Sequence, residues 1–126
     1  MKEKILFVDD SKLMRKIVNQ TLAKINVEII DASDGKEALK VLENLYKEIK
    51  LILTDWNMPN MNGFELLQVV KSNNNYKHIP VILTTSEAEK EHINKALKAG
   101  AADYIIKPFN TKELIKTVLR SLKRDI

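Results

Sequence analysis

The sequence predicts an α/β fold, a doubly wound sheet of five parallel strands with five helices. Short apolar runs alternate along the chain with longer segments whose apolar residues recur at helical spacing. Runs that are apolar on both faces, such as residues 5–8 and 51–54, are typical of central strands that helices cover on both sides. Strict alternation of strand and helix indicates consecutive βα units, and right-handed crossovers limit their topology.

Five short runs along the chain are predicted to be the strands. Pro80 lies near the start of the fourth run, which is a position where a sheet tolerates proline. The runs cover residues 4–8, 27–31, 50–54, 79–84 and 103–106.

The segments between and after these strands are predicted to be helices, because their apolar residues lie three or four positions apart. The fourth helix has the thinnest apolar stripe, which fits a mobile element, and contains only Ile93, Ala96 and Leu97. The other stripes are Leu13, Ile17, Val18, Thr21, Leu22 and Ile25 in the first helix, Ala38, Leu39, Leu42 and Leu45 in the second, Leu66, Leu67 and Val70 in the third, and Leu114, Ile115, Val118, Leu119 and Leu122 in the fifth.

Four of the helix starts also carry a capping pattern. An Asp, Asn or Ser accepts a hydrogen bond from the first turn of a helix, and a Glu three residues later strengthens the start. The pairs that match are Asp34 with Glu37, Asn62 with Glu65, Ser86 with Glu89, and Asn110 with Glu113.

Length and composition indicate a single globular domain. The chain has 126 residues, of which 44% are hydrophobic and 30% are charged, and this is enough for a core. It has no cysteine, so disulfides, thiolate metal sites and a cysteine nucleophile are excluded. No signal-peptide pattern or membrane-length apolar run occurs. We expect one domain over residues 1–126, with no output domain, in a soluble cytoplasmic protein that does not bind membranes.

The net charge is +4, and part of the basic excess lies near the C-terminus. Lys112, Lys116 and Arg120 share one face of the last predicted helix. A solvated helix face is the favoured interpretation, and a docking surface for an acidic partner is the alternative. Nucleic-acid binding is not expected, because acids are interspersed along the chain and no recognition motif occurs.

Three carboxylates and one lysine follow the predicted strands. Asp9 and Asp10 end the first apolar run, Asp55 ends the third, and Lys107 ends the fifth. Ligands of such sheets bind at the carboxyl ends of the strands, so we expect these four side chains to converge. Crowded carboxylates repel one another unless a cation compensates. A hard divalent metal beside a lysine that binds an anion suggests phosphate chemistry.

The motifs around these residues, taken together and in order, resemble the response-regulator receiver domain over essentially the whole chain. The stretch from Asp55 to Gly63 is especially similar to the CheY-like, single-domain chemotaxis regulators of this family, which have a flavodoxin-like fold. The matching stretches are Phe7-Val8-Asp9-Asp10-Ser11, residues 54–63 (Thr-Asp-Trp-Asn-Met-Pro-Asn-Met-Asn-Gly), Thr84-Thr85-Ser86 and residues 104–109 (Tyr-Ile-Ile-Lys-Pro-Phe).

The resemblance implies a phosphoacceptor site. Asp55 would be the nucleophile, since a carboxylate can attack phosphorus to give an aspartyl phosphate. Asp9, Asp10 and Asp55 would bind Mg²⁺, with the backbone carbonyl of Asn57 as a further ligand. Magnesium retains several waters, so few protein ligands suffice. Lys107 would pair with the phosphoryl oxygens.

The resemblance also implies a switch. Thr85 would bond the phosphoryl group, with Ser86 as second choice because Ser86 is also a good helix cap. Tyr104 would then rotate inward, as a population shift that phosphorylation drives. Asn57 and Glu87 would tune autodephosphorylation. In this family the peptide bond that corresponds to Lys107-Pro108 is cis.

The function that follows is a two-component signalling switch rather than an enzyme acting on a separate substrate. A CheA-like histidine kinase would phosphorylate this phosphoprotein, which would catalyse its own phosphorylation and autodephosphorylation. The fourth helix, fifth strand and fifth helix would then bind a target, expected to be a FliM-like flagellar motor switch protein that controls flagellar rotation. The protein is expected to be monomeric. Trp56 is read as an exposed aromatic without a catalytic role, and His78 and His92 as surface residues.

Three alternative functions make other demands on the sequence. A phosphorelay intermediate would pass its phosphoryl group to a histidine phosphotransfer protein. A metal-dependent aspartyl phosphatase would need a second acid two residues after the nucleophile, where this chain has Asn57. A flavodoxin-like electron carrier would need a phosphate loop after the first strand, where the acids at positions 9 and 10 have the wrong charge.

Overall fold

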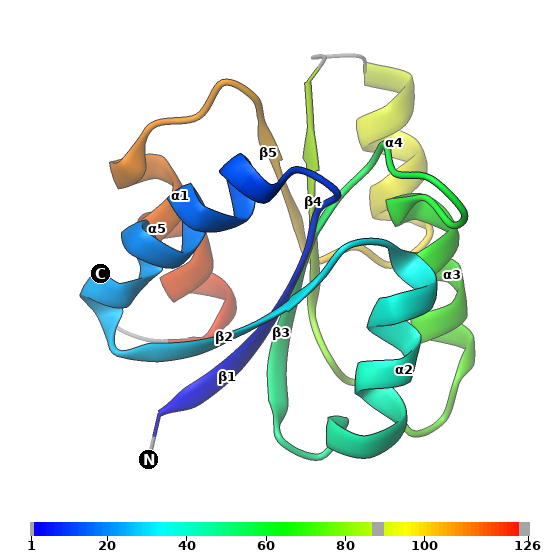
Figure 1. Ribbon diagram of the computed structural model, residues 1–126. Helices are drawn as coiled ribbons and strands as arrows, with labels where there is room; N and C mark the ends of the chain where they lie inside the picture. Colours follow the sequence, from blue (N-terminus) through cyan, green and yellow to red (C-terminus); the bar gives the residue numbers. More distant parts are fainter. Residues whose placement is uncertain (1, 87–89, 124–126) are drawn as a thin grey trace.

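The computed structural model describes residues 2–86 and 90–123. In this part of the chain, five parallel strands form one sheet in the order β2-β1-β3-β4-β5, which confirms the predicted fold class (Figure 1). The strands are β1 (Glu3–Val8), β2 (Val27–Ala32), β3 (Ile49–Asp55), β4 (Val81–Thr85) and β5 (Asp103–Ile106). The helices are α1 (Lys12–Leu22), α2 (Gly35–Leu45), α3 (Gly63–Ser72), α4 (Lys90–Lys98) and α5 (Thr111–Ser121), and a short 3-10 helix η1 (Ala23–Ile25) follows α1.

Helices cover both faces of the sheet, so the protein has a core on each side. In Figure 1, α1 and α5 lie on one side of the sheet and α2, α3 and α4 on the other. Successive residues of β1 contribute to the two cores in turn, since Ile5 and Phe7 join one cluster and Leu6 and Val8 the other. All four side chains are at most 1% exposed. This double burial explains why the strand is continuously apolar.

Four helices begin at a side chain that accepts a hydrogen bond from the backbone N–H three residues later. At Asn62 the capping is reciprocal, because the carboxylate of Glu65 accepts from the backbone N–H of Asn62 at 3.0 Å. The predicted pair of Ser86 and Glu89 lies partly outside the described residues. The observed capping residues are Ser11, Asp34, Asn62 and Asn110.

The apolar stripe of α1 is narrower than the sequence predicted. Val18 and Leu22 are fully buried, but Leu13 is 68% exposed and Ile17 is 40% exposed. The helix buries only the side that faces β1 and α5, and Leu13 and Ile17, four positions apart, lie on the solvent side. Leu97 of α4 is likewise 44% exposed, which leaves that helix with little apolar contact.

The fourth strand begins later and ends one residue further on than predicted. Pro80 lies just before β4, and its carbonyl accepts a hydrogen bond from the N–H of Ile52 at 2.9 Å. Thr85 is the last residue of β4 because its pairing with Ile106 extends the ladder. The hydroxyl of Thr85 therefore belongs to the end of a strand rather than to the loop after it.

The strand register brings the predicted site residues to one edge of the sheet. Val8 pairs with Thr54, and Asp55 pairs with Thr84, so β1, β3 and β4 end at nearly the same level. Lys107 follows the last residue of β5 at the same edge. No helix within residues 2–86 and 90–123 is both long and apolar enough to cross a membrane.

Candidate functional site

Three carboxylates meet at the carboxyl edge of the sheet, as the sequence predicted. Asp9 follows β1 and is 1% exposed, Asp55 ends β3 and is 9% exposed, and Asp10 is exposed. One carboxylate oxygen of each lies within 4.8 Å of the others. Two of these acids are therefore held out of water beside a third.

Lys107 is the cation of this site. Its Nζ lies 3.1 Å from Oδ1 of Asp55 and 3.6 Å from Oδ2 of Asp9. The backbone N–H of Lys107 donates to the carbonyl of Thr85 at 2.6 Å, which ties the start of the following loop to β4. The Lys107-Pro108 bond is cis, as the family resemblance implied. A single ammonium thus faces two buried carboxylates.

The protein environment disfavours the charged form of Asp55. Burial raises the pKa of Asp55 above its ordinary value of 3.8, and the Asp9 carboxylate acts in the same direction. Lys107 and the Trp56 N–H, which donates to Asp55 Oδ1 at 2.9 Å, lower the pKa but do not outweigh burial. The site therefore has more negative charge than its own residues stabilise.

An additional cation fits this donor set. Oδ2 of Asp9 is buried and has no hydrogen-bond partner in the described part of the chain. An oxygen in this condition is costly unless a ligand satisfies it. Three carboxylate oxygens that can converge are the ligands that Mg²⁺ prefers, and the exposure of Asp10 leaves room for bound waters.

The turn between β1 and α1 fixes the backbone that carries the two adjacent acids. The N–H of Asp9 donates to the carbonyl of Ala32 at 3.0 Å, and the N–H of Ser11 donates to Oδ1 of Asp9 at 2.9 Å. Nη1 of Arg15, on α1, donates to the carbonyl of Asp9 at 2.6 Å. Sequence reasoning missed Arg15, because nothing in the helical pattern shows that this side chain turns back toward the loop.

The loop between β3 and α3 is held closely against the acceptor. A Cβ on Gly63 would lie 2.1 Å from the carbonyl oxygen of Asp55, so only glycine allows this approach. The side-chain amide of Asn60, a residue with φ of +67°, donates to Oδ2 of Asp34 at 2.8 Å. Asn57 is exposed within this loop, two residues after Asp55. The carbonyl of Asn57 therefore belongs to a loop that packs against Asp55 at Gly63 and is bonded to Asp34 at Asn60.

The hydroxyl and aromatic candidates lie at the end of β4 and on the edge strand β5. Thr85 is 5% exposed, and Tyr104 on β5 is half-buried. Thr84, the cross-strand partner of Asp55, is also buried, and within the described residues its Oγ1 has no partner. Both threonines are thus at the correct edge, and the choice of Thr85 remains a prediction. Glu87 lies outside the described residues.

Trp56 is buried, which corrects the prediction of an exposed aromatic. It is 8% exposed, because its ring stacks on Phe64 at 5.4 Å between centroids and on His92 at 4.8 Å. Lys95 lies 4.5 Å above the Phe64 ring. His92 is therefore a packing residue of α4 rather than a simple surface residue. This stack connects α4 to the residue directly after Asp55.

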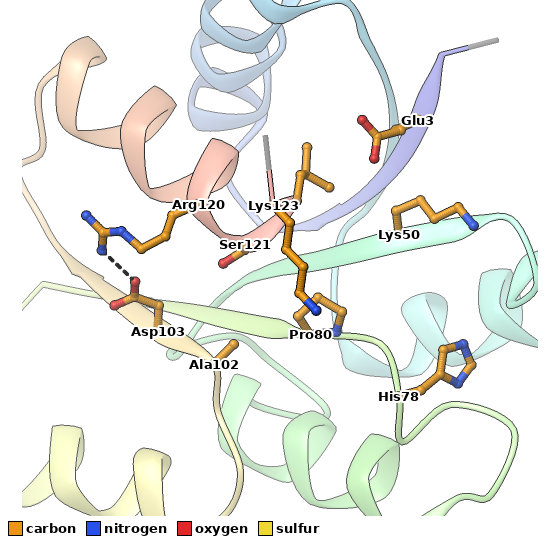
Figure 2. Close-up of a pocket in the computed structure, with 10 residues that line it drawn as sticks. Glu3, Lys50, His78, Pro80, Ala102, Asp103, Arg120, Ser121 and Lys123 are labelled. Carbon is orange, nitrogen blue, oxygen red and sulfur yellow. Dashed lines mark hydrogen bonds and ion pairs between the residues drawn. The ribbon is translucent and has the colours of Figure 1, made fainter. Parts of the chain in front are cut away.

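A separate hollow of about 470 Å³ lies at the opposite, amino-terminal edge of the sheet (Figure 2). The side chain of Arg120 donates to Oδ2 of Asp103 at 3.2 Å on one side of this hollow. His78, which is exposed, lies on another side of it. The residues lining the hollow include no group of acids comparable to the site around Asp55. The carboxyl edge is therefore the candidate functional site.

Comparison with known families places the whole of this site inside one match. The family model of the response regulator receiver domain matches residues 5–119. Among curated proteins, the chemotaxis protein CheY1 of Helicobacter pylori strain J99 is 42% identical over 120 residues, which cover 92% of this chain and 96% of that protein. A CheY homologue of Campylobacter jejuni is 40% identical, covering 94% of this chain and 91% of that protein.

Solved structures show the same similarity in three dimensions. The chemotaxis response regulator CheY4 of Vibrio cholerae superposes with a TM-score of 0.88 at 36% sequence identity, covering 96% of this chain and 99% of that chain. The receiver domain of a Francisella response regulator superposes with the same TM-score at 31% identity.

Proposed function

The chain belongs to the response-regulator receiver family, with CheY-type chemotaxis regulators among its relatives, and we propose that Asp55 is its phosphoacceptor. One observation carries this proposal. Asp55 is a buried carboxylate at the end of β3, with an ammonium 3.1 Å away and two further acids within 4.8 Å. A surface or capping aspartate would have no reason to share a site with two other acids and a lysine.

The proposed reaction is transfer of a phosphoryl group from a phosphohistidine of a partner kinase. An oxygen of Asp55 forms a bond to phosphorus, and the bond between phosphorus and the imidazole nitrogen of the donor breaks. The electron pair of the broken bond stays on the imidazole, which then takes up a proton. Lys107 already contacts Asp55 and stabilises the negative charge of the phosphoryl oxygens.

We propose that Asp9, Asp10 and Asp55 bind Mg²⁺ together with the carbonyl of Asn57. When bound, Mg²⁺ offsets the charge between the carboxylate and the incoming phosphoryl group. Two observations support this assignment. Oδ2 of Asp9 is a buried acceptor without a hydrogen-bond donor in the described chain, and burial raises the pKa of Asp55, so a bound cation would stabilise both carboxylates. Asn57 and Glu87 are proposed to tune the hydrolysis of the aspartyl phosphate.

The proposed output is a change at the surface formed by α4, β5 and α5. Thr85 would move toward the phosphoryl group, and Tyr104, which pairs with the residue two positions before Thr85, would follow. The exposed Leu97 and the small apolar contact of α4 support a movable element on this surface. The Trp56 stack gives α4 a second connection to the acceptor.

The proposed partners are a histidine kinase and a flagellar motor switch protein, with the domain acting as a monomer. The match covers 96% of the Helicobacter chemotaxis protein CheY1, and this similarity supports a chemotaxis role for the domain. Binding of the phosphorylated protein to a motor-switch peptide tests the chemotaxis role. Transfer of the phosphoryl group to a histidine phosphotransfer protein, without peptide binding, would assign the protein to a phosphorelay.

The acceptor is tested by intact-protein mass spectrometry after incubation with acetyl phosphate and Mg²⁺. We expect one added phosphoryl group on the wild-type protein and none on Asp55→Asn. Asp103→Asn is the matched control, since it removes an acid from β5 at the opposite edge of the sheet and should leave phosphorylation unchanged. An Asp55→Asn variant that gains the same mass would refute the assignment.

A further inference from the structure

The contact between Arg15 and the β1–α1 turn has a particular target. Nη1 of Arg15 donates to the carbonyl oxygen of Asp9 at 2.6 Å, rather than to a carboxylate. That carbonyl belongs to the peptide group joining Asp9 to Asp10, and a peptide group is planar. The bond therefore fixes the orientation of the plane that links the two adjacent acids.

Asp10 depends on this backbone more than its neighbour does. Oδ1 of Asp9 is held by the N–H of Ser11, and Asp9 is buried. Asp10 is exposed, and its side chain makes no hydrogen bond within residues 2–86 and 90–123. The peptide plane that precedes Asp10 positions its Cα, the point from which the Asp10 carboxylate extends toward the cluster.

We propose that Arg15 is a positioning residue for the cation site, holding the Asp9-Asp10 peptide so that the carboxylate of Asp10 faces the site. This inference rests on the proposed binding of Mg²⁺ at the acidic cluster. Groups that orient metal ligands without touching the metal typically change its affinity by about 10- to 100-fold when removed. The side chain of Arg15, on α1, is half-buried and forms no ion pair with any described residue.

Electrostatics and positioning predict opposite results for the same substitution. Arg15 carries a permanent positive charge near three acids, so its removal would strengthen binding of a divalent cation if charge were its only role. If Arg15 instead holds the peptide plane, its removal weakens binding despite the more negative site. The sign of the change in affinity therefore separates the two roles.

The experiment measures Mg²⁺ affinity by titration of the fluorescence of Trp56, the only tryptophan, in wild type, Arg15→Gln, Arg15→Lys and Lys16→Gln. Lys16→Gln is the matched control, since it removes the same charge from an exposed neighbour that has no described partner. We expect binding about 10-fold weaker in Arg15→Gln, intermediate in Arg15→Lys, and equal or slightly tighter in Lys16→Gln. Phosphorylation of Arg15→Gln by acetyl phosphate should return to the wild-type rate when Mg²⁺ is saturating.

Urea unfolding without metal, followed by circular dichroism, identifies a variant that is merely unstable. Arg15→Gln should remain folded at the titration temperature, and if it does not, Arg15→Lys carries the test with the same expected direction. Equal or tighter Mg²⁺ binding by Arg15→Gln, or by Arg15→Lys in its place, overturns the positioning role. A wild-type protein without any Mg²⁺ response overturns the metal site itself, and Arg15 with it.

Discussion

Replacing Asp55 by Asn is expected to stabilise the metal-free protein, although it removes the central residue of the proposed site. Asp55 contacts one ammonium at 3.1 Å, while two other carboxylates lie within 4.8 Å. At an effective dielectric constant of about 20, the attraction to Lys107 at 3.1 Å is about 5 kcal/mol, and the repulsion from buried Asp9 at the 4.8 Å limit is about 3.5 kcal/mol. The attraction exceeds this repulsion, but burial of the charge outweighs the remaining attraction and leaves the pKa of Asp55 raised, so the ionised carboxylate is a net cost in the metal-free protein.

Asn keeps the shape of the side chain and an oxygen that can accept from Lys107, but it carries no charge. We therefore expect the free energy of unfolding of Asp55→Asn to rise by about 1–2 kcal/mol at pH 7.5 without metal. This corresponds to an increase in melting temperature of about 3–8 °C for a domain of this size. Addition of Mg²⁺ should stabilise the wild type more than the variant, since a ligand of the folded state adds to its stability.

The gain should depend on pH in a defined direction. Because the pKa of Asp55 is raised in the folded state above its ordinary value of 3.8, the wild type loses stability as the pH rises through the interval between these two values. Below about pH 3 the carboxyl is protonated in both states, so the difference from Asn should vanish. Above the folded-state pKa the difference should be constant.

Urea and thermal unfolding followed by circular dichroism at several pH values measure this effect, with EDTA present. Asp103→Asn is the control, since its half-exposed carboxylate is already paired with Arg120 and its loss should lower stability by at most about 1 kcal/mol. An Asp55→Asn variant that is equal to or less stable than wild type at pH 7.5 would refute the reasoning. Such a result would mean that the protein stabilises the negative charge of Asp55 without metal.

Three further substitutions test how the site is built. Gly63→Ala should lower the free energy of unfolding by about 1–3 kcal/mol, because its Cβ would lie 2.1 Å from the carbonyl of Asp55; a urea midpoint equal to wild type would contradict this packing. Asn62→Ala should lower it by about 1 kcal/mol, since the cap on the N–H of Glu65 is lost, and circular dichroism melting measures this. Lys71→Met should lower it by about 1–3 kcal/mol, because the Nζ bonds to the carbonyls at positions 77 and 79 disappear; unchanged urea unfolding would argue against that role.

Residue patterns alone were enough to predict the sheet and the edge at which the acids cluster. Strands that are buried on both faces leave a continuous apolar run, and the polar residue after each run marks its carboxyl end. Asp9, Asp10, Asp55 and Lys107 all follow such runs, so their convergence could be predicted without coordinates. The caps at Asp34, Asn62 and Asn110 could be predicted because capping depends on residues only three positions apart.

The exposure of individual side chains required the tertiary structure. Periodicity shows that residues share a helix face but not how wide a face the sheet covers, so the pattern could not show that Leu13 and Ile17 are exposed. Trp56 was wrongly expected to be exposed, because Phe64 and His92, which cover its ring, come from two different helices. Both outcomes depend on how elements far apart in the sequence pack together.

Local spacing along the chain was therefore enough to predict the fold class, the order and approximate positions of the strands, and the residues of the acidic cluster. Three other features required the coordinates: the ammonium of Lys107 lies near both Asp55 and Asp9, Oδ2 of Asp9 has no hydrogen-bond partner in the described chain, and Arg15 donates to the Asp9 carbonyl. These features are distances between side chains and backbone atoms of separate elements. They follow from strand register and helix packing, which no local pattern contains.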